Sequence, residues 1–362
     1  MKSNRSTYRH INSSLKQLYP KSLTGRQAQH IDVLTAIMTG LVISQSSHLE
    51  KIARKMPSDN QIESRIKSCT RFNQNENIAI ETHYMPFLLP LIMSLAETGL
   101  IVLAMDGSKT GRKCVTLMVS IIYEKRSIPI AWLTVKGSKG HLPEDVHLEL
   151  FRKIQGVFPP NCDIIFLGDG EFDGIGLQKA VIEAGWSYVC RTAKNCIIVD
   201  GDDVFSLSEV CIDTSEEVLG IQNVGFTHDA YPVVQVIIWW AKGYKDPIYL
   251  VTNMECAEEA CHYYKYRFRI ETFFSDQKSR GFNLQQSHIS DPDRIARFLI
   301  VTCLAYVWII YLGVQVRDKV PVLKMIHRAD RCDLSLFQLG IRYFEYLLNR
   351  GELQPFHLNW SV

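Results

Sequence analysis

Paired cysteines and a leading apolar stretch are both missing from this sequence. Its ten cysteines include no Cys-x-x-Cys motif, and the first residues after Met1 are polar or charged. A disulfide framework and a secretory signal peptide are therefore not predicted, and we expect free thiols in a reducing cytoplasm. Cys256, Cys261 and His262 are close in sequence, but no fourth ligand stands at a zinc-site spacing, so buried or incidental thiols are the preferred interpretation.

Low-complexity tracts, short-period repeats and long apolar runs are also scarce. The segment that most resembles a membrane span, Phe298–Val314, is short for a bilayer and contains Thr302 and several aromatic residues. We predict a buried core helix there and no membrane partner. With 362 residues, of which 46% are hydrophobic and 22% charged, the chain has the composition of a globular protein of two or three domains.

The charge is uneven along the chain. Residues 1–71 carry 12 Lys and Arg against 4 Asp and Glu, whereas the remainder has 28 against 34. A basic amino-terminal segment indicates a nucleic-acid-binding module, with a solvated basic face as the alternative. Two short helices separated by Pro57 are predicted there, and the second, with Ser58 as its N-cap, carries Arg65, Lys67 and Arg71. They resemble a helix-turn-helix DNA reader, although a purely structural helical bundle fits equally well.

A different pattern begins near residue 100. Apolar runs alternate with amphipathic stretches in the order β-β-β-α-β-α-β, which predicts a mixed α/β sheet. The expected strands are Leu100–Met105, Cys114–Tyr123, Ser127–Val135, Asp163–Leu167 and Trp186–Cys190, and the first three form an antiparallel meander. Residues 193–252 are strand-like and rich in turns, and further helices are expected over 264–278, 295–313 and 334–348.

Two aspartates stand where strands of this sheet are expected to end. Asp106 and Asp169 each follow an apolar run and precede a glycine. If the two strands are neighbours, both carboxylates point into one crevice at the sheet edge, and Glu271 on a nearby helix can join them. Three oxygen ligands without a histidine suit Mg²⁺ or Mn²⁺. Glu171 and Asp173 are the alternatives for the second position.

The segment 264–278 places four polar groups at helical spacing. Tyr264, Arg267, Glu271 and Lys278 would share one stripe of a continuous helix, with Tyr263, Tyr266, Ile270 and Phe273 on the side that packs against the sheet. A carboxylate can bind a divalent metal ion, and the cations and phenol can bind phosphate oxygens. This combination predicts phosphodiester chemistry on a nucleic acid.

These residues also carry a family resemblance. The spacing Tyr264-x2-Arg267-x3-Glu271-x6-Lys278 is similar to the Tyr-Arg-Glu-Lys signature of DDE transposases of the insertion-sequence-four family, and Asp106-Gly107 and Asp169-Gly170 resemble its two Asp motifs. The resemblance implies a ribonuclease H-like fold interrupted by a β-rich insertion. It also implies that Asp106, Asp169 and Glu271 bind two Mg²⁺ or Mn²⁺ ions.

The partners implied by the resemblance are DNA and a second copy of the chain. Such an enzyme cuts the terminal inverted repeats of a bacterial transposon and joins them to target DNA as a homodimer, in the cytoplasm at the nucleoid. Tyr264, Arg267 and Lys278 would contact the transposon end. Trp240, or alternatively Trp239, would receive a flipped base if a hairpin intermediate forms.

The resemblance and the element pattern together divide the chain. The expected parts are a helical DNA-binding domain (1–98), the first part of the catalytic core (99–192), the β-rich insertion (193–253), the second part of the core (254–320) and a carboxyl-terminal helical segment (321–362). A further set of basic residues is expected along a DNA channel: Lys109, Arg112, Lys113, Lys136, Lys139 and His141. A ribonuclease H-like nuclease without strand transfer and an inactive DNA-binding derivative are the alternatives.

Overall fold

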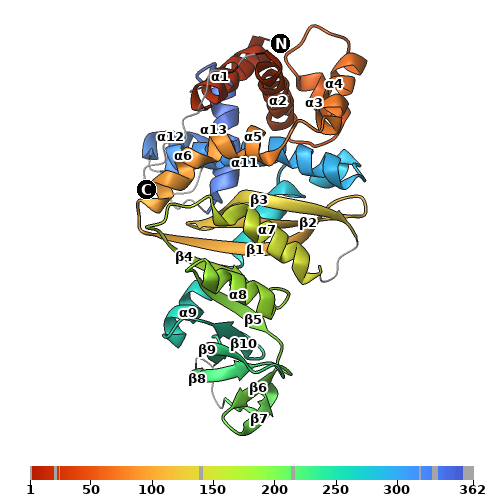
Figure 1. Cartoon of the computed structure of the whole chain (residues 1–362). Helices are drawn as coiled ribbons and strands as arrows, with labels where there is room; N and C mark the ends of the chain where they lie inside the picture. The colour runs from red at the N-terminus through yellow and green to blue at the C-terminus, as the bar shows by residue number, and fades with distance from the viewer. Residues whose placement is uncertain are drawn as a thin grey trace.

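A ten-stranded mixed sheet runs through the structure, a computed structural model that describes residues 2–19, 23, 25–137, 142–212, 217–317, 319–327 and 333–353. Its strand order is β3-β2-β1-β4-β5-β10-β9-β8-β6-β7. The two basic residues Lys139 and His141 lie outside the described residues. Figure 1 shows helices gathered at one end of the molecule, the strands β1 to β4 in the middle and the strands β6 to β10 at the other end.

One half of the sheet begins, at its β3 edge, with an antiparallel meander, as predicted. The strands β1 (Leu100–Gly111), β2 (Cys114–Tyr123) and β3 (Arg126–Lys136) pair in sequence order. The strands β4 (Asp163–Gly168) and β5 (Ser187–Thr192) then pair parallel to β1 and to each other. The order 3-2-1-4-5, with β2 alone antiparallel to the rest, is the ribonuclease H-like arrangement, so the predicted fold class is confirmed.

Two helices connect these strands, and five further strands extend the sheet. The crossovers from β3 to β4 and from β4 to β5 contain α7 (Glu144–Gln155) and α8 (Ile175–Glu183). The added strands are β6 (Ile197–Asp200), β7 (Asp203–Ser206), β8 (Val218–Phe226), β9 (Tyr231–Trp239) and β10 (Ile248–Thr252). Because β10 pairs with β5, this strand-rich segment continues the sheet. The limits given above for the five parts of the chain stay a prediction.

The amino-terminal part is helical, and its helices are α1 (Lys2–Leu18), α2 (Gly25–Ser44), α3 (Leu49–Lys55), α4 (Ile62–Gln74), α5 (Ile80–His83) and α6 (Met85–Ala96). The predicted N-cap at Ser58 is wrong, because α4 begins at Ile62 after Gln61 and without a side-chain cap. The Ser58 hydroxyl instead accepts a hydrogen bond from the Asn60 backbone N–H in the turn before the helix. Helix α1 was not predicted.

The carboxyl-terminal helices pack among the amino-terminal ones. They are α11 (Pro292–Arg317), α12 (Val320–Ile326) and α13 (Leu336–Arg350), and Figure 1 shows them beside α1, α2 and α6. Helix α11 is long and apolar enough to cross a membrane, but 89% of its most apolar window is buried inside the protein. It also packs against α2, α4, α13 and the strand β3. The prediction of a core helix is therefore confirmed.

Candidate active site

Asp106 and Asp169 lie side by side, on β1 and just past the end of its neighbour β4. In the parallel pair β1–β4, Ala104 is level with Leu167, and two residues further along each chain stand the two aspartates. One detail of the prediction is wrong, because β1 does not end at Asp106 but continues to Gly111 by pairing with β2. It is β4 that ends, at Gly168, so β1 loses one neighbour at the level of Asp106. Both carboxylates are half-buried at this opening.

Glu271 lies on α10 (Arg269–Gln277), which packs across β1, β2 and β3. The continuous helix expected over 264–278 is wrong. Helix α9 (Ala257–Tyr264) ends before α10, and backbone bonds of the i to i−3 type join them, including Arg267 N to Tyr264 O at 3.0 Å. Lys278 follows the last residue of α10 and has non-helical backbone angles. The simple stripe of four residues is therefore interrupted on both sides of Glu271.

The break changes which side chains are buried. Ile270 and Phe273 are buried as expected, but Tyr264 and Arg267 are also only 2% and 6% exposed. Burial raises the pKa of Tyr264 to about 12, so its phenol stays protonated at neutral pH. Tyr263 and Tyr266, expected on the buried side, are half-buried.

Arg267 is the cation placed among the carboxylates. Its Nη2 lies 3.0 Å from Oε1 of Glu271, and its guanidinium stacks on the ring of Phe268 at 4.2 Å. Burial and the neighbouring charge of Asp169 raise the pKa of Asp106 to about 7, while Arg267 and the Gly107 N–H counteract this rise. Burial, with a further contribution from the charge of Asp169, thus favours a bound proton or a nearby cation at Asp106.

Lys278 ties the end of α10 to the strand β1. Its Nζ donates a hydrogen bond to the hydroxyl of Ser108 at 2.5 Å, two residues beyond Asp106. The ammonium also lies 5.8 Å from the ring centre of Phe274. A positive charge is therefore held at the rim of the site, on the β1 side.

A single cavity of about 1250 Å³ joins these groups. Its lining includes the three predicted carboxylates, Arg267 and Lys278, together with the cations Lys109, Arg191 and Lys194 and the acids Glu171 and Asp246. The structure does not bring Tyr264 or Trp240 into this lining. The Trp240 indole N–H instead donates to the backbone oxygen of Tyr244 at 2.9 Å. Arg112, Lys113 and Lys136 are exposed outside the cavity.

Sequence reasoning missed Arg191 and Lys194. Arg191 stands at the end of an apolar strand, the same signal that identified Asp169. Of the two alternative acids, Glu171 lines the cavity but accepts a hydrogen bond from the backbone N–H of Leu142 at 2.5 Å, whereas Asp173 is not in the lining. The structure therefore favours Asp169 over either alternative as the partner of Asp106.

The sequence matches a known family over the region that contains this site. The model of the family described as "Transposase DDE domain" matches residues 103–308, which is more than half of the chain. The chain belongs to this family. Asp106, Asp169 and Glu271 all fall within the matched residues.

Comparison with solved structures gives distant likenesses. The chain is similar to the piggyBac transposase in a cryo-EM structure of its synaptic complex with hairpin DNA, with 13% sequence identity and a TM-score of 0.47. The match covers 98% of this chain and 80% of that one. A search of curated proteins found no match.

The donor set fits the divalent metal ions that DDE transposases generally use. Asp106, Asp169 and Glu271 offer only carboxylate oxygens, the ligands that Mg²⁺ and Mn²⁺ prefer. Within the described ranges, no three His, Cys, Asp or Glu side chains already lie close enough to hold one ion. The raised pKa of Asp106 supports the fit, because a bound cation would compensate the buried negative charge and the repulsion from Asp169, as a proton does.

The turn between β4 and α8 contains a glycine with a structural role. The Glu144 carboxylate accepts a hydrogen bond from the Leu177 N–H at 2.9 Å and so occupies the N-terminus of α8. A Cβ atom on Gly174 would lie 2.3 Å from that carboxylate. The helix end therefore faces a negative side chain of the protein, and Gly174 makes room for it.

Proposed function

We propose that the chain is the transposase of a bacterial insertion sequence in the insertion-sequence-four branch of the DDE family. It would cut transposon ends and join them to target DNA at the site of Asp106, Asp169 and Glu271. The observation that carries the proposal is the level placement of Asp106 and Asp169 on adjacent strands, in one cavity with Glu271. The spacing of Tyr264, Arg267, Glu271 and Lys278 supports the narrower branch.

The three carboxylates, two lysines and one arginine of the cavity each have a role in this reaction. Two Mg²⁺ or Mn²⁺ ions, when held by the three carboxylates, would activate the attacking oxygen and stabilise the leaving one. Lys109 and Lys278 bind phosphate oxygens beside the cleaved bond. Arg267 orients the Glu271 carboxylate through their ion pair. In the first step water would attack the phosphate at the transposon end, and the 3′-oxygen of that end would leave. In the second step the resulting 3′-hydroxyl would attack a target phosphate and displace the 3′-oxygen of the target strand.

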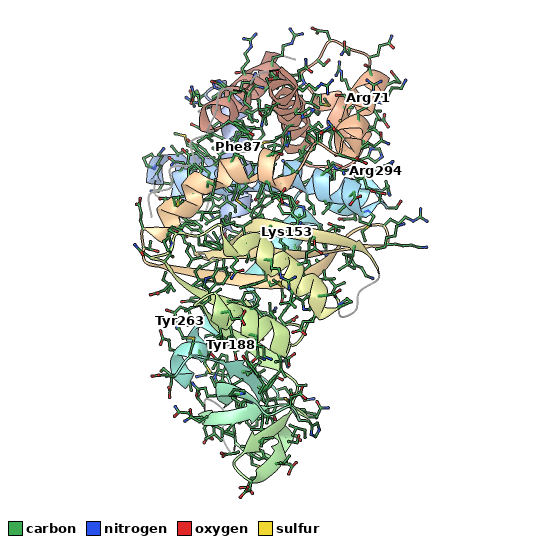
Figure 2. The ribbon with its side chains drawn as sticks, viewed as in Figure 1. Arg71, Phe87, Lys153, Tyr188, Tyr263 and Arg294 are labelled. Carbon is green, nitrogen blue, oxygen red and sulfur yellow. The ribbon has the colours of Figure 1, made fainter. Side chains whose placement is uncertain are left out.

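The remaining parts of the proposal concern DNA and assembly. The helical region 1–98 would bind the terminal repeats as double-stranded DNA, and the active complex would contain two copies of the chain. Lys67 and Arg71 on α4 are exposed, as a DNA-contacting helix requires, and Figure 2 shows Arg71 at the surface of that region. Trp240 would receive a flipped base, and the protein would act in the cytoplasm at the nucleoid. Because Tyr264 is buried, it would support Arg267 rather than contact DNA directly.

A cleavage assay on a labelled transposon end tests this function. The DNA that flanks the reading frame supplies the short inverted repeat used as substrate. With Mg²⁺ we expect a nick that leaves a 3′-hydroxyl at the repeat, followed by joining to a target plasmid. Cleavage without joining would indicate a nuclease, and binding without cleavage would indicate an inactive DNA-binding derivative.

A further inference from the structure

The cavity has cations on both sides of its carboxylates. Lys109 and Lys278 lie on the side of β1, since Lys109 belongs to that strand and Lys278 bonds to its Ser108. Arg191 and Lys194 lie on the side of β5, at the end of the strand and in the turn that follows. The first pair already has a role in the proposed reaction, whereas the second pair has none.

The sheet register fixes the position of Arg191 relative to the aspartates. In the parallel pair β4–β5, Gly168 is level with Cys190, so the next residues, Asp169 and Arg191, are also level. One line across β1, β4 and β5 therefore contains Asp106, Asp169 and Arg191. Because neighbouring strands are about 4.8 Å apart, Arg191 and Asp106 start from backbones about 10 Å apart, with Asp169 between them.

The guanidinium of Arg191 is available for an anion. Arg191 and Lys194 are exposed, and within the part of the chain that the structure describes neither side chain is recorded in an ion pair. Two other acids line the cavity. The Glu171 carboxylate already accepts the Leu142 N–H and lies 3.5 Å from Nε2 of His147, while Asp246 lies in the turn between β9 and β10. An exposed arginine without a carboxylate partner is well suited to bidentate phosphate binding.

We propose that Arg191 and Lys194 bind backbone phosphates of the transposon end on the opposite side of the cleaved bond from Lys109 and Lys278. The proposal rests on the proposed function, since it assumes that the cleaved bond lies at the carboxylates. The DNA then crosses the strands β1, β4 and β5 instead of following β1. A separation of about 10 Å corresponds to about three base-pair steps of 3.4 Å.

The salt dependence of DNA binding tests whether these residues contact phosphates. Arg191→Ala/Lys194→Ala is compared with Arg152→Ala/Lys153→Ala, which removes the same charge from exposed positions on α7 outside the cavity (Figure 2). Binding of a labelled end is measured in EDTA, so that cleavage does not enter. For the cavity pair we expect the slope of log K against log salt to fall by about 0.9 per lost contact. A slope equal to that of the α7 control overturns the proposal.

Phosphate ethylation interference tests on which side the contacts lie. Wild-type protein should show two groups of sensitive phosphates, one on each side of the cleaved bond. Arg191→Ala/Lys194→Ala should lose one group and Lys278→Ala the other. Loss of the same group by both variants contradicts the proposal. Failure of the wild-type protein to cleave would contradict the proposed function alone, because both binding measurements still report whether Arg191 and Lys194 contact DNA.

Discussion

Arg267 and Glu271, four residues apart, form an ion pair with 3.0 Å between Nη2 and Oε1. The arginine side chain is 7% exposed and the glutamate side chain 54%, so the cation approaches the carboxylate from inside the protein and leaves its other side open to the cavity. The same guanidinium also acts on Asp106. Arg267 therefore holds the carboxylates together before any metal ion binds, and it competes with that ion for their charge.

Replacing Arg267 should separate these two effects. For Arg267→Gln we expect Mn²⁺ to bind up to about tenfold more tightly in the absence of DNA, because a buried positive charge is removed from beside Asp106 and Glu271. Cleavage should nevertheless fall, because Glu271 loses its orienting partner. Isothermal titration with Mn²⁺ measures the first effect.

Arg269→Gln provides the control. This residue lies on the same helix, but its guanidinium stacks on the ring of Tyr266 at 3.9 Å and does not line the cavity. Its Mn²⁺ affinity should match the wild type. Equal affinities for both variants would show that Arg267 does not compete with the metal.

The stability of the metal-free protein should depend on pH through Asp106. Its pKa is raised to about 7 in the folded state, so the folded protein holds the proton more tightly than the unfolded chain does. This stabilisation is complete below the unfolded pKa of about 3.9 and is lost as the pH rises through about 7. Melting temperatures measured from about pH 5 to about pH 8 should therefore fall, and added Mn²⁺ should restore more stability at the higher pH.

The variant Asp106→Asn tests whether Asp106 causes this pH dependence of stability. Asp276 has a pKa raised to about 6 by burial and contributes with the same sign, so the wild type and Asp106→Asn must be compared directly. The fall in melting temperature should be shallower in the variant, and the Mn²⁺ effect should be largely lost. Parallel curves for the two proteins would rule out the assignment to Asp106.

A buried ion pair should anchor the far end of the Glu271 helix. Arg126 at the start of β3 and Asp276 of α10 lie 3.6 Å apart, with side chains 9% and 2% exposed. Arg126→Met leaves the Asp276 carboxylate buried without its partner, which should cost about 3 kcal/mol in the free energy of unfolding. Asp276→Asn removes the buried charge and should cost less. The double variant Arg126→Met/Asp276→Asn should recover much of the stability that Arg126→Met loses. Urea unfolding measures the free energy of unfolding of all three variants. If the losses of the two single variants simply added in the double variant, the two side chains would not be energetically coupled.

The sequence predicted the aspartate pair because local pattern and topology agree there. Apolar runs before Asp106 and Asp169 identified two strands, and the crossover between them made these strands parallel neighbours. The true length of β1 was not predictable in the same way. Residues from Gly107 to Gly111 read as a polar turn and become strand only because β2 pairs with them. This pairing is a tertiary contact that a local pattern does not contain.

The helix break and the β5 side of the cavity were missed for similar reasons. Nothing between Tyr264 and Lys278 is a proline or glycine, so the spacing alone favoured one continuous helix. The structure instead buries Tyr264 and Arg267 together, which a regular stripe does not reveal. Arg191 directly follows the expected strand Trp186–Cys190, but only the register of β5 with β4 places it level with Asp169.

The most direct test of the account is single-turnover cleavage of a labelled transposon end in Mg²⁺ by carboxylate variants. Asp106→Asn, Asp169→Asn and Glu271→Gln should each lose cleavage by at least about 1000-fold, as expected when a group acts only in the transition state. DNA binding measured in EDTA should stay close to that of the wild type. Asp246→Asn, which lines the same cavity outside the carboxylate row, should still cleave. Wild-type cleavage by any of the three variants would contradict the assignment of the site.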